Sequence, residues 1–278
     1  MQHLCKVSAM CLTAASLVLA QIQPVVSGDD GKGEVDWSER YIVATGIGAP
    51  NPNLPESAQR PGAERAAKIV ALRNALETVK GMYLNSSTTI ENFMTKNDVV
   101  STSVSGFIQG FEKEGRTKYM SDGTVEITMK IPLDGVGGLG AKVYGDNIGD
   151  KPSVSQWDGK GAKKKMVFTG LIIDCKGLNV KPALSPKVLD ESGKEIYGSA
   201  YVSREWAVKY GIVGYAKNVL KASKLGRVGD SPGKVTAVKA SGANSTDVVL
   251  SNKDAAEVRS AAENLKFLSE CRVIFVVD

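Results

Sequence analysis

The strongest pattern in the chain is an apolar stripe with helical spacing. Large apolar residues recur at three- and four-residue steps, at Ile69, Leu72, Leu76 and Val79. Alanines lie beside them in the sequence. This spacing is typical of an amphipathic helix, which we expect to span Gln59–Lys80. Because the neighbouring alanines are small, the helix can lie close against a sheet. The stripe therefore predicts a helix-on-sheet fold.

The sheet beneath this helix is expected to be antiparallel. Its strands are predicted at Tyr41–Gly48, Met82–Ile90, Phe107–Tyr119 and Thr124–Leu133. In the last of these, apolar and polar residues alternate, which is typical of a sheet with one covered face and one wet face. The tripeptide Ser121-Asp122-Gly123 before it predicts a tight hairpin turn.

The N-terminus has the pattern of an export signal. Lys6 precedes an apolar run, Val7–Ala20, and small residues follow at Ser27 and Gly28. The run is shorter than the roughly 20 residues that a membrane span needs. Cleavage at Cys11 for lipid attachment would leave the second half of this run, Leu12–Ala20, in the mature chain. We therefore expect a signal peptide over residues 1–28, cleaved after about Gly28, and a periplasmic product.

Removal of the signal peptide would leave a chain without histidine. His3 is the only histidine, and Cys5 and Cys11 would be lost with it. Ser-His-Asp and Cys-His catalytic sets and histidine-based zinc sites all depend on imidazole. We therefore predict a protein that is not an enzyme, with no catalytic residues, cofactor or metal.

A glycine-rich segment, residues 135–166, is expected to link two domains. Gly135, Gly137 and Gly140 match the dinucleotide-binding spacing, but further glycines soon interrupt the helix that this motif must open. The basic cluster Lys160–Lys165 lies in the same segment and lacks the interleaved aromatics of a nucleic-acid surface. Neither nucleotide nor nucleic acid is expected to bind.

The resulting fold class is α+β with two small domains. Residues 29–134 form the helix-on-sheet domain, and residues 167–278 form a second α+β domain. The latter begins with an apolar strand, Val167–Cys175, and ends with another, Cys271–Asp278. A last helix from about Asn252 is expected to cover its sheet.

The two cysteines of the mature chain lie at the ends of these terminal strands. If the strands are antiparallel neighbours with Cys175 opposite Cys271, then Asp174 faces Arg272 and Leu171 faces Phe275. This register pairs opposite charges and apolar residues. It predicts a disulfide, worth about 4 kcal/mol in the chain-entropy model, and an Asp174–Arg272 ion pair. Two buried free thiols are the alternative.

Part of the chain resembles a known family. The segments ERAAKIVALRNALETVKGMYL, GFIQGF and YMSDGTVEITMKIPL resemble the Lpp-twenty family of bacterial envelope lipoproteins and the N-terminal domain of flagellar assembly protein T. The resemblance covers about Arg40 to Leu133. It implies a helix-on-sheet module without catalytic residues, associated with outer-membrane or flagellar structures. The chain departs from the lipoproteins because it lacks a convincing lipidated cysteine.

Two functions of different class follow from these observations. The first is an exported envelope protein with a structural or assembly role, whose partners are envelope proteins such as flagellar basal-body or outer-membrane components. The second is a periplasmic ligand-binding module. It requires a large pocket between the domains, lined by Trp157, Trp206 or Tyr215.

Overall fold

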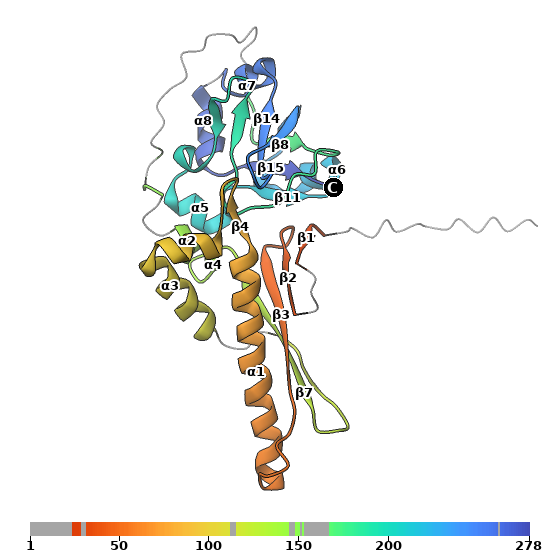
Figure 1. Cartoon of the computed structure of the whole chain (residues 1–278). Coiled ribbons are helices and arrows are strands. Elements are labelled where there is room, and N and C mark those ends of the chain that lie inside the picture. The colour runs from red at the N-terminus through yellow and green to blue at the C-terminus, as the bar shows by residue number, and fades with distance from the viewer. Residues whose placement is uncertain are drawn as a thin grey trace, which may run out of the picture.

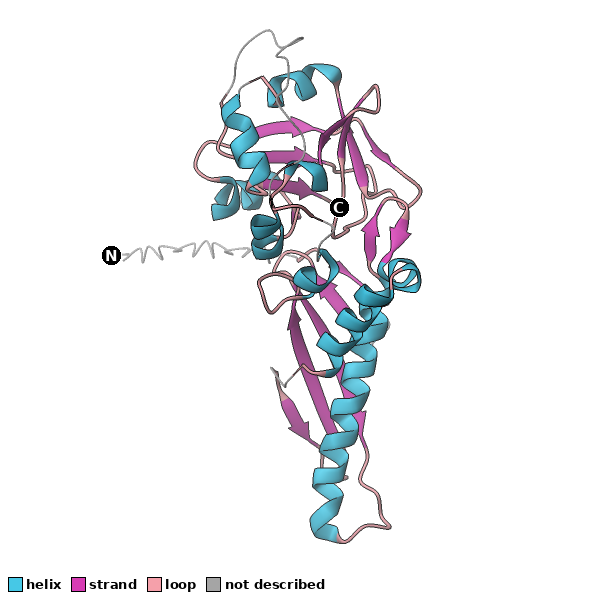
Figure 2. Ribbon diagram, turned by 90° about the vertical axis from the view of Figure 1, so that its left-hand side faces the viewer, coloured by secondary structure: helices cyan, strands magenta, loops and turns pink. Residues whose placement is uncertain are grey.

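The protein is α+β and has two parts, an elongated arm and a rounder head (Figure 1). The computed structural model describes residues 24–28, 32–111, 115–144, 148–150, 152, 167–260 and 262–278. The arm consists of helix α1 and a five-stranded sheet, and the head consists of residues 167–278 (Figures 1 and 2). The predicted fold class is confirmed.

The sheet of the arm is antiparallel, with the strand order β1-β2-β3-β7-β6. Its strands are β1 (Val26–Ser27), β2 (Gly33–Asp36), β3 (Tyr41–Gly48), β6 (Thr117–Tyr119) and β7 (Val125–Pro132). The predicted strands Tyr41–Gly48 and Thr124–Leu133 are therefore confirmed, and the hairpin closes where Gly123 N donates to Met120 O. Helix α1 covers one face of this sheet. On the other face, the side-chain hydroxyls of Thr45 and Thr128 form a hydrogen bond of 3.2 Å.

Helix α1 (Glu56–Gly81) lies along β3 and confirms the predicted helix. Its buried side chains come every four residues and are small: Ala63, Ala67, Ala71, Ala75 and Val79. On the facing strand, a Cβ atom at Gly46 would stand 2.2 Å from Ala67 O, and one at Gly48 would stand 2.1 Å from Ala63 O. Alanine and glycine thus bring the helix backbone almost into contact with the strand backbone.

Shorter elements join the arm to the head. They are the hairpin of β4 (Tyr83–Asn85) and β5 (Thr88–Thr89), and the helices α2 (Ile90–Lys96), α3 (Asp98–Gln109) and α4 (Leu139–Tyr144). The predicted strand Phe107–Tyr119 is wrong over its first part, because α3 runs to Gln109. Asn97 caps this helix by accepting a hydrogen bond from Val100 N. Helix α4 occupies part of the predicted linker, so the connection is structured up to residue 144.

Strand β1 lies within the predicted signal peptide. Val26 and Ser27 pair with Asp36 and Val35 of β2, and the side chain of Val25 is buried in the core. A cut after Gly28 would therefore remove a strand from the sheet. Residues 1–23, which hold the rest of the predicted signal, lie outside the described part of the chain.

The head contains two four-stranded sheets. The parallel sheet has the order β11-β15-β8-β12, and the mixed sheet has the order β10-β9-β14-β13. Their strands are β8 (Leu171–Asp174), β9 (Val188–Asp190), β10 (Glu195–Tyr197), β11 (Gly214–Ala216), β12 (Gly233–Thr236), β13 (Lys239–Ser241), β14 (Asp247–Leu250) and β15 (Val273–Val276).

Short helices cover the sheets of the head. They are α5 (Arg204–Tyr210), α6 (Val219–Lys224), α7 (Asn252–Val258) and α8 (Ala262–Ser269), with the 3-10 turns η2 (Ser199–Tyr201) and η3 (Gly226–Val228). The predicted last helix is thus two helices. Ser251 caps the first by accepting from Asp254 N. Helix α6 packs on one face of the parallel sheet, and the other face belongs to the main core.

We predict that Gly46→Ala lowers the free energy of unfolding by about 1–3 kcal/mol, because the new methyl group must displace the backbone of α1. Gly62→Ala, inside α1 where only Leu54 Cδ1 comes within 3.7 Å, is the matched control. It should be neutral or stabilising by up to about 1 kcal/mol. Urea unfolding of both variants measures this, and equal stabilities would contradict the tight contact.

Candidate functional site

One hydrophobic core runs from the arm into the head. The turn after β2 places Trp37 against Tyr215 of β11, with ring centroids 5.5 Å apart and planes at 70°. Tyr215 in turn meets Phe275 of β15 at 6.0 Å. All three side chains are buried in a single apolar cluster. The arm is therefore packed into the head, not tethered beside it.

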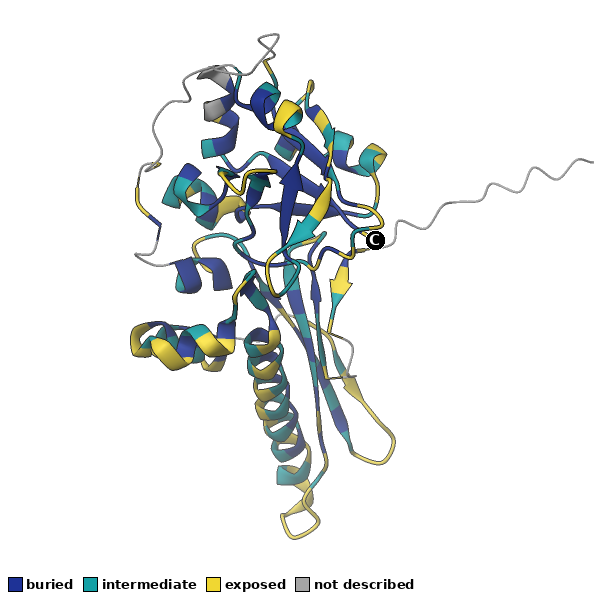
Figure 3. Ribbon diagram, turned by 45° about the horizontal axis from the view of Figure 1, so that its top comes forward, coloured by how far each residue is buried: buried dark blue, intermediate teal, exposed yellow. Residues whose placement is uncertain are grey.

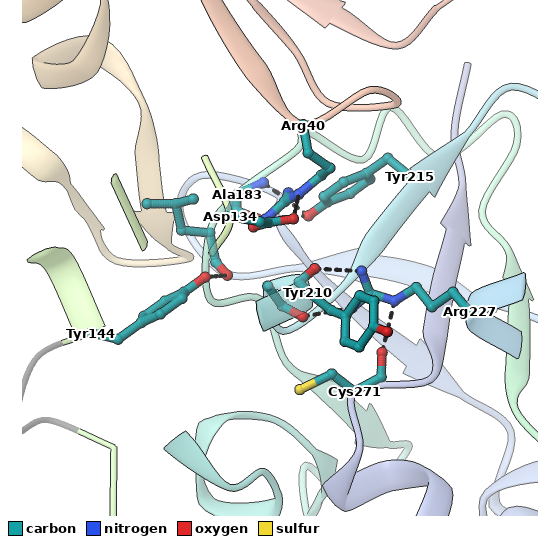
Figure 4. A network of polar contacts seen from close by, with 10 residues as sticks. Arg40, Asp134, Tyr144, Ala183, Tyr210, Tyr215, Arg227 and Cys271 are labelled. Atoms are coloured by element: carbon teal, nitrogen blue, oxygen red, sulfur yellow. Dashed lines mark hydrogen bonds and ion pairs between the residues drawn. The ribbon is translucent and has the colours of Figure 1, made fainter. Parts of the chain in front are cut away.

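A buried ion pair of the arm lies at this junction (Figure 4). Arg40 donates through Nε and Nη2 to the two carboxylate oxygens of Asp134, each at 2.8 Å. The side chains are only 12% and 19% exposed. Arg40 adopts a left-handed backbone conformation with φ 62°. Despite burial, which alone would lower it, the pKa of Arg40 is raised, because Asp134 holds the guanidinium charged.

Gly211, at the C-terminal end of α5, makes room for this pair. A Cβ atom there would stand 2.0 Å from Arg40 Nη2, and the φ of +69° also favours glycine. On the other side of this backbone, Arg227 donates to the carbonyls of Tyr210 and Gly211, each at 2.6 Å, and to that of Cys271 at 2.7 Å. Arg227 thus caps α5, and burial lowers its pKa.

Backbone hydrogen bonds complete the junction. Leu184 N and Ser185 N of the head donate to the carbonyls of Tyr83 and Leu84 in β4, and Asn244 N donates to Ser86 O. The hairpin β4–β5 is therefore held between two loops of the head.

Two buried tyrosine hydroxyls also donate hydrogen bonds to backbone carbonyls near the junction. The hydroxyl of Tyr144 in α4 donates to Leu184 O at 2.9 Å, and that of Tyr197 in β10 donates to Ile212 O at 2.6 Å. Burial raises the pKa of both tyrosines, so both remain neutral donors at neutral pH.

The predicted disulfide is wrong for this fold. Strands β8 and β15 are parallel neighbours, with Leu171 opposite Val273 and Asp174 opposite Val276. Cys175 therefore follows the end of one strand, whereas Cys271 precedes the start of the other. At about 3.3 Å per residue the two lie about 20 Å apart along the strands, far beyond the reach of a disulfide. Both are buried free thiols, which was the alternative.

The predicted Asp174–Arg272 ion pair is wrong for the same reason. Arg272 Nε instead donates to Glu270 at 2.7 Å. Asp174 accepts from Lys176 N at 3.2 Å. It also lines a hollow of about 330 Å3 beside Lys234 and Asp254.

Three further exposed hollows are present among the described residues. One, about 660 Å3, is lined by Val136 and Asp150 together with Val208 and Lys209 of α5. The other two lie at opposite parts of the molecule. The first, about 400 Å3, is at the far end of the arm between the loop after β3 and the β6–β7 hairpin. The second, about 390 Å3, lies at the end of α5 in the head. Of the three residues predicted to line a ligand pocket, Trp206 lines the second hollow, Tyr215 is buried in the junction, and Trp157 lies outside the described residues.

Two features are missing from the described part of the chain. Within that part of the chain, none of the helices combines the length and apolar character needed to cross a membrane. No group of three or more histidine, cysteine, aspartate and glutamate side chains is placed there to hold a metal ion.

The comparison with known proteins concerns the head. Residues 170–278 match a family model described as the second domain of Treponema pallidum Tp0624. This span begins one residue before β8 and includes both sheets of the head. The chain matches no curated protein. The resemblance of the arm to the Lpp-twenty family stays a prediction.

We predict that Arg40→Met lowers the free energy of unfolding by about 3–5 kcal/mol, because it leaves the Asp134 carboxylate buried without its partner. Glu77→Gln breaks the exposed pair with Lys80 and should cost less than about 1 kcal/mol. Denaturant unfolding compares the two. A cost for Arg40→Met no larger than that for Glu77→Gln would show that the junction does not depend on the ion pair.

We also predict that Cys175 and Cys271 are free but unreactive in the native protein. Burial raises the pKa of Cys271 to about 11 and that of Cys175 further, so little thiolate forms at pH 8. Iodoacetamide should modify both only after unfolding, without any reductant, as read by peptide mass spectrometry. Recovery of a Cys175–Cys271 crosslinked peptide would contradict the parallel register.

Proposed function

We propose that this protein is an exported, non-enzymatic component of the bacterial cell envelope with a structural or assembly role. Its partners are other envelope proteins, among them flagellar basal-body or outer-membrane components. The observation that carries this proposal is the far end of the arm, which projects away from the head (Figure 3). Large apolar residues at this end are exposed. The export signal of this proposal ends upstream of Pro24, which preserves β1.

The far end of the arm presents several large apolar residues together. Their exposed fractions are 40% for Leu54, 48% for Tyr119 and 43% for Met120. Ile47 is also exposed but lies on the other face of the sheet, opposite Glu126. Tyr119 and Met120 also line the hollow at this end. Clustered apolar groups at the tip of a projecting element favour contact with another protein. We call Leu54, Tyr119 and Met120 the tip surface.

The tip surface is held in one conformation before any partner arrives. Prolines at positions 50, 52 and 55 restrict the loop after β3, and Pro50 packs against Gly123 of the hairpin. Tyr119 is fixed by a hydrogen bond to Glu64 at 2.7 Å and by the guanidinium of Arg60, 4.0 Å from its ring. A preorganised surface loses little conformational entropy on binding.

The test is site-specific photo-crosslinking in intact cells. A photoreactive amino acid at Leu54 or Met120 should give discrete adducts with envelope proteins. The same group at Leu220 in α6, which is 76% exposed on the head, is the matched control and should not give those adducts. Leu54→Asp should abolish the Met120 adduct with little change in the melting temperature, because Leu54 lies in the loop after β3 and is 40% exposed.

Each outcome of this experiment is informative. Adducts with basal-body proteins select a flagellar role, and adducts with outer-membrane proteins select an outer-membrane role. Equal adducts from Leu220 and Leu54, or none from either tip position, would count against the tip surface as the contact. Fractionation that leaves the full-length chain in the cytoplasm would refute export.

The alternative function, a ligand-binding module, receives support from two hollows. One, about 660 Å3, is lined by Val136 and Asp150 together with Val208 and Lys209 of α5 in the head. Tyr215 lies in the solid core of the junction, so it does not line a pocket between arm and head. Trp206, however, lines the hollow at the end of α5 together with a second aromatic ring and two arginines.

A further inference from the structure

We propose that the hollow at the end of α5 binds a monosaccharide that carries a carboxylate. We call it the α5 hollow. It lies on the head, in the region matched by the family model, and is independent of the tip surface. Its lining comes from α5, η3 and the residues before β15: Trp206, Tyr210, Gly226, Arg227, Glu270 and Arg272.

An aromatic pair forms one wall of the α5 hollow. Trp206 and Tyr210 are four residues apart on α5, so they lie on the same face of the helix. Their rings are stacked, with centroids 5.5 Å apart and an angle of 12° between the planes. Tyr210 is 38% exposed. A partly exposed, flat aromatic surface beside a concavity is suited to the apolar face of a small ring.

The facing wall is positively charged. Arg227 donates through Nε, Nη1 and Nη2 to neutral carbonyls, those of Cys271, Tyr210 and Gly211. Arg272 bonds to Glu270 through Nε at 2.7 Å. Within the described part of the chain, Glu270 is the only carboxylate bonded to either guanidinium. Two arginines thus face one acid. Arg227 already donates to carbonyls through Nε, Nη1 and Nη2, so the Nη atoms of Arg272, whose side chain is 36% exposed, are the donors for a ligand carboxylate.

The hollow limits the ligand to a single small ring. A volume of about 390 Å3 accommodates one such ring but not a folded chain. A purely aromatic ligand would leave the polar atoms of Arg272 and Glu270 without hydroxyl partners. A sugar acid meets both requirements, because its ring face is apolar, its edge carries hydroxyls, and its carboxylate matches an arginine in geometry and charge.

The test compares glucuronate with glucose, which share a ring and differ at the carboxylate. Calorimetric titration of the full chain at low ionic strength should show glucuronate binding at least about tenfold more tightly than glucose, since a hydrogen bond to a charged group contributes about 1.5–3 kcal/mol. Acetate supplies the carboxylate without the ring and should bind far more weakly than glucuronate.

Two variants locate the binding. Arg272→Gln should remove the tenfold preference for glucuronate, whereas Lys253→Gln, which removes a positive charge from the exposed start of α7, should retain it. Trp206→Leu should weaken both sugars. Because Trp206 also packs against the core, the melting temperature of Trp206→Leu is measured as well. If that variant is unstable, the binding data for Arg272→Gln alone test the proposed site.

Three results would overturn the proposal. They are equal binding of glucose and glucuronate, competition by acetate as strong as that by glucuronate, and a preference for glucuronate that survives Arg272→Gln. None of these bears on the tip surface, so the proposed envelope role is tested separately.

Discussion

The turn between β2 and β3 fixes how the two parts of this protein sit. Within four residues it supplies Trp37 to the core of the head and Arg40 to the buried pair with Asp134. The apolar contact favours docking. The ion pair, whose two partners both belong to the arm, fixes the start of β3 beside the end of β7, where Gly211 of the head packs against Arg40. Gly211 completes the fit by leaving space where any side chain would collide with Arg40.

Much of the arm could be predicted from the sequence, because its pattern and its packing agree. The alternation over Thr124–Leu133 specifies its buried face. In α1 the helix is predicted correctly, but its buried face is the line of alanines, and Ile69 of the predicted stripe is 52% exposed. The error at Phe107–Tyr119 came from an apolar run that was assigned as a strand. A helical signal was present just before it, since Asn97 is a cap and Val100, Val104 and Ile108 recur every four residues. Their β-branched side chains make this helix hard to recognise by propensity.

The head shows what local sequence cannot specify. With β8 and β15 antiparallel, Leu171 would face Phe275; in the parallel arrangement it faces Val273. Apolar residues face apolar residues in both arrangements, so the sequence does not determine the relative direction of the two strands. For the same reason it does not determine where Cys175 lies relative to Cys271. Nor could the junction and the α5 hollow be foreseen in full. Trp206 was a predicted pocket residue, but Arg227 joins it only through tertiary contact.

The seam between α1 and β3 has a mechanical consequence. In most helix-on-sheet layers, interdigitated side chains separate the backbones and let the layers slide by small rotamer changes. Here Gly46 and Gly48 of β3 face alanines of α1, so no large side chains separate the two backbones. The carbonyls of the helix therefore lie almost in contact with the strand. The arm therefore behaves as a stiff rod that is anchored at Trp37. A load applied to the tip surface turns the head with it, and the molecule transmits orientation over the length of α1.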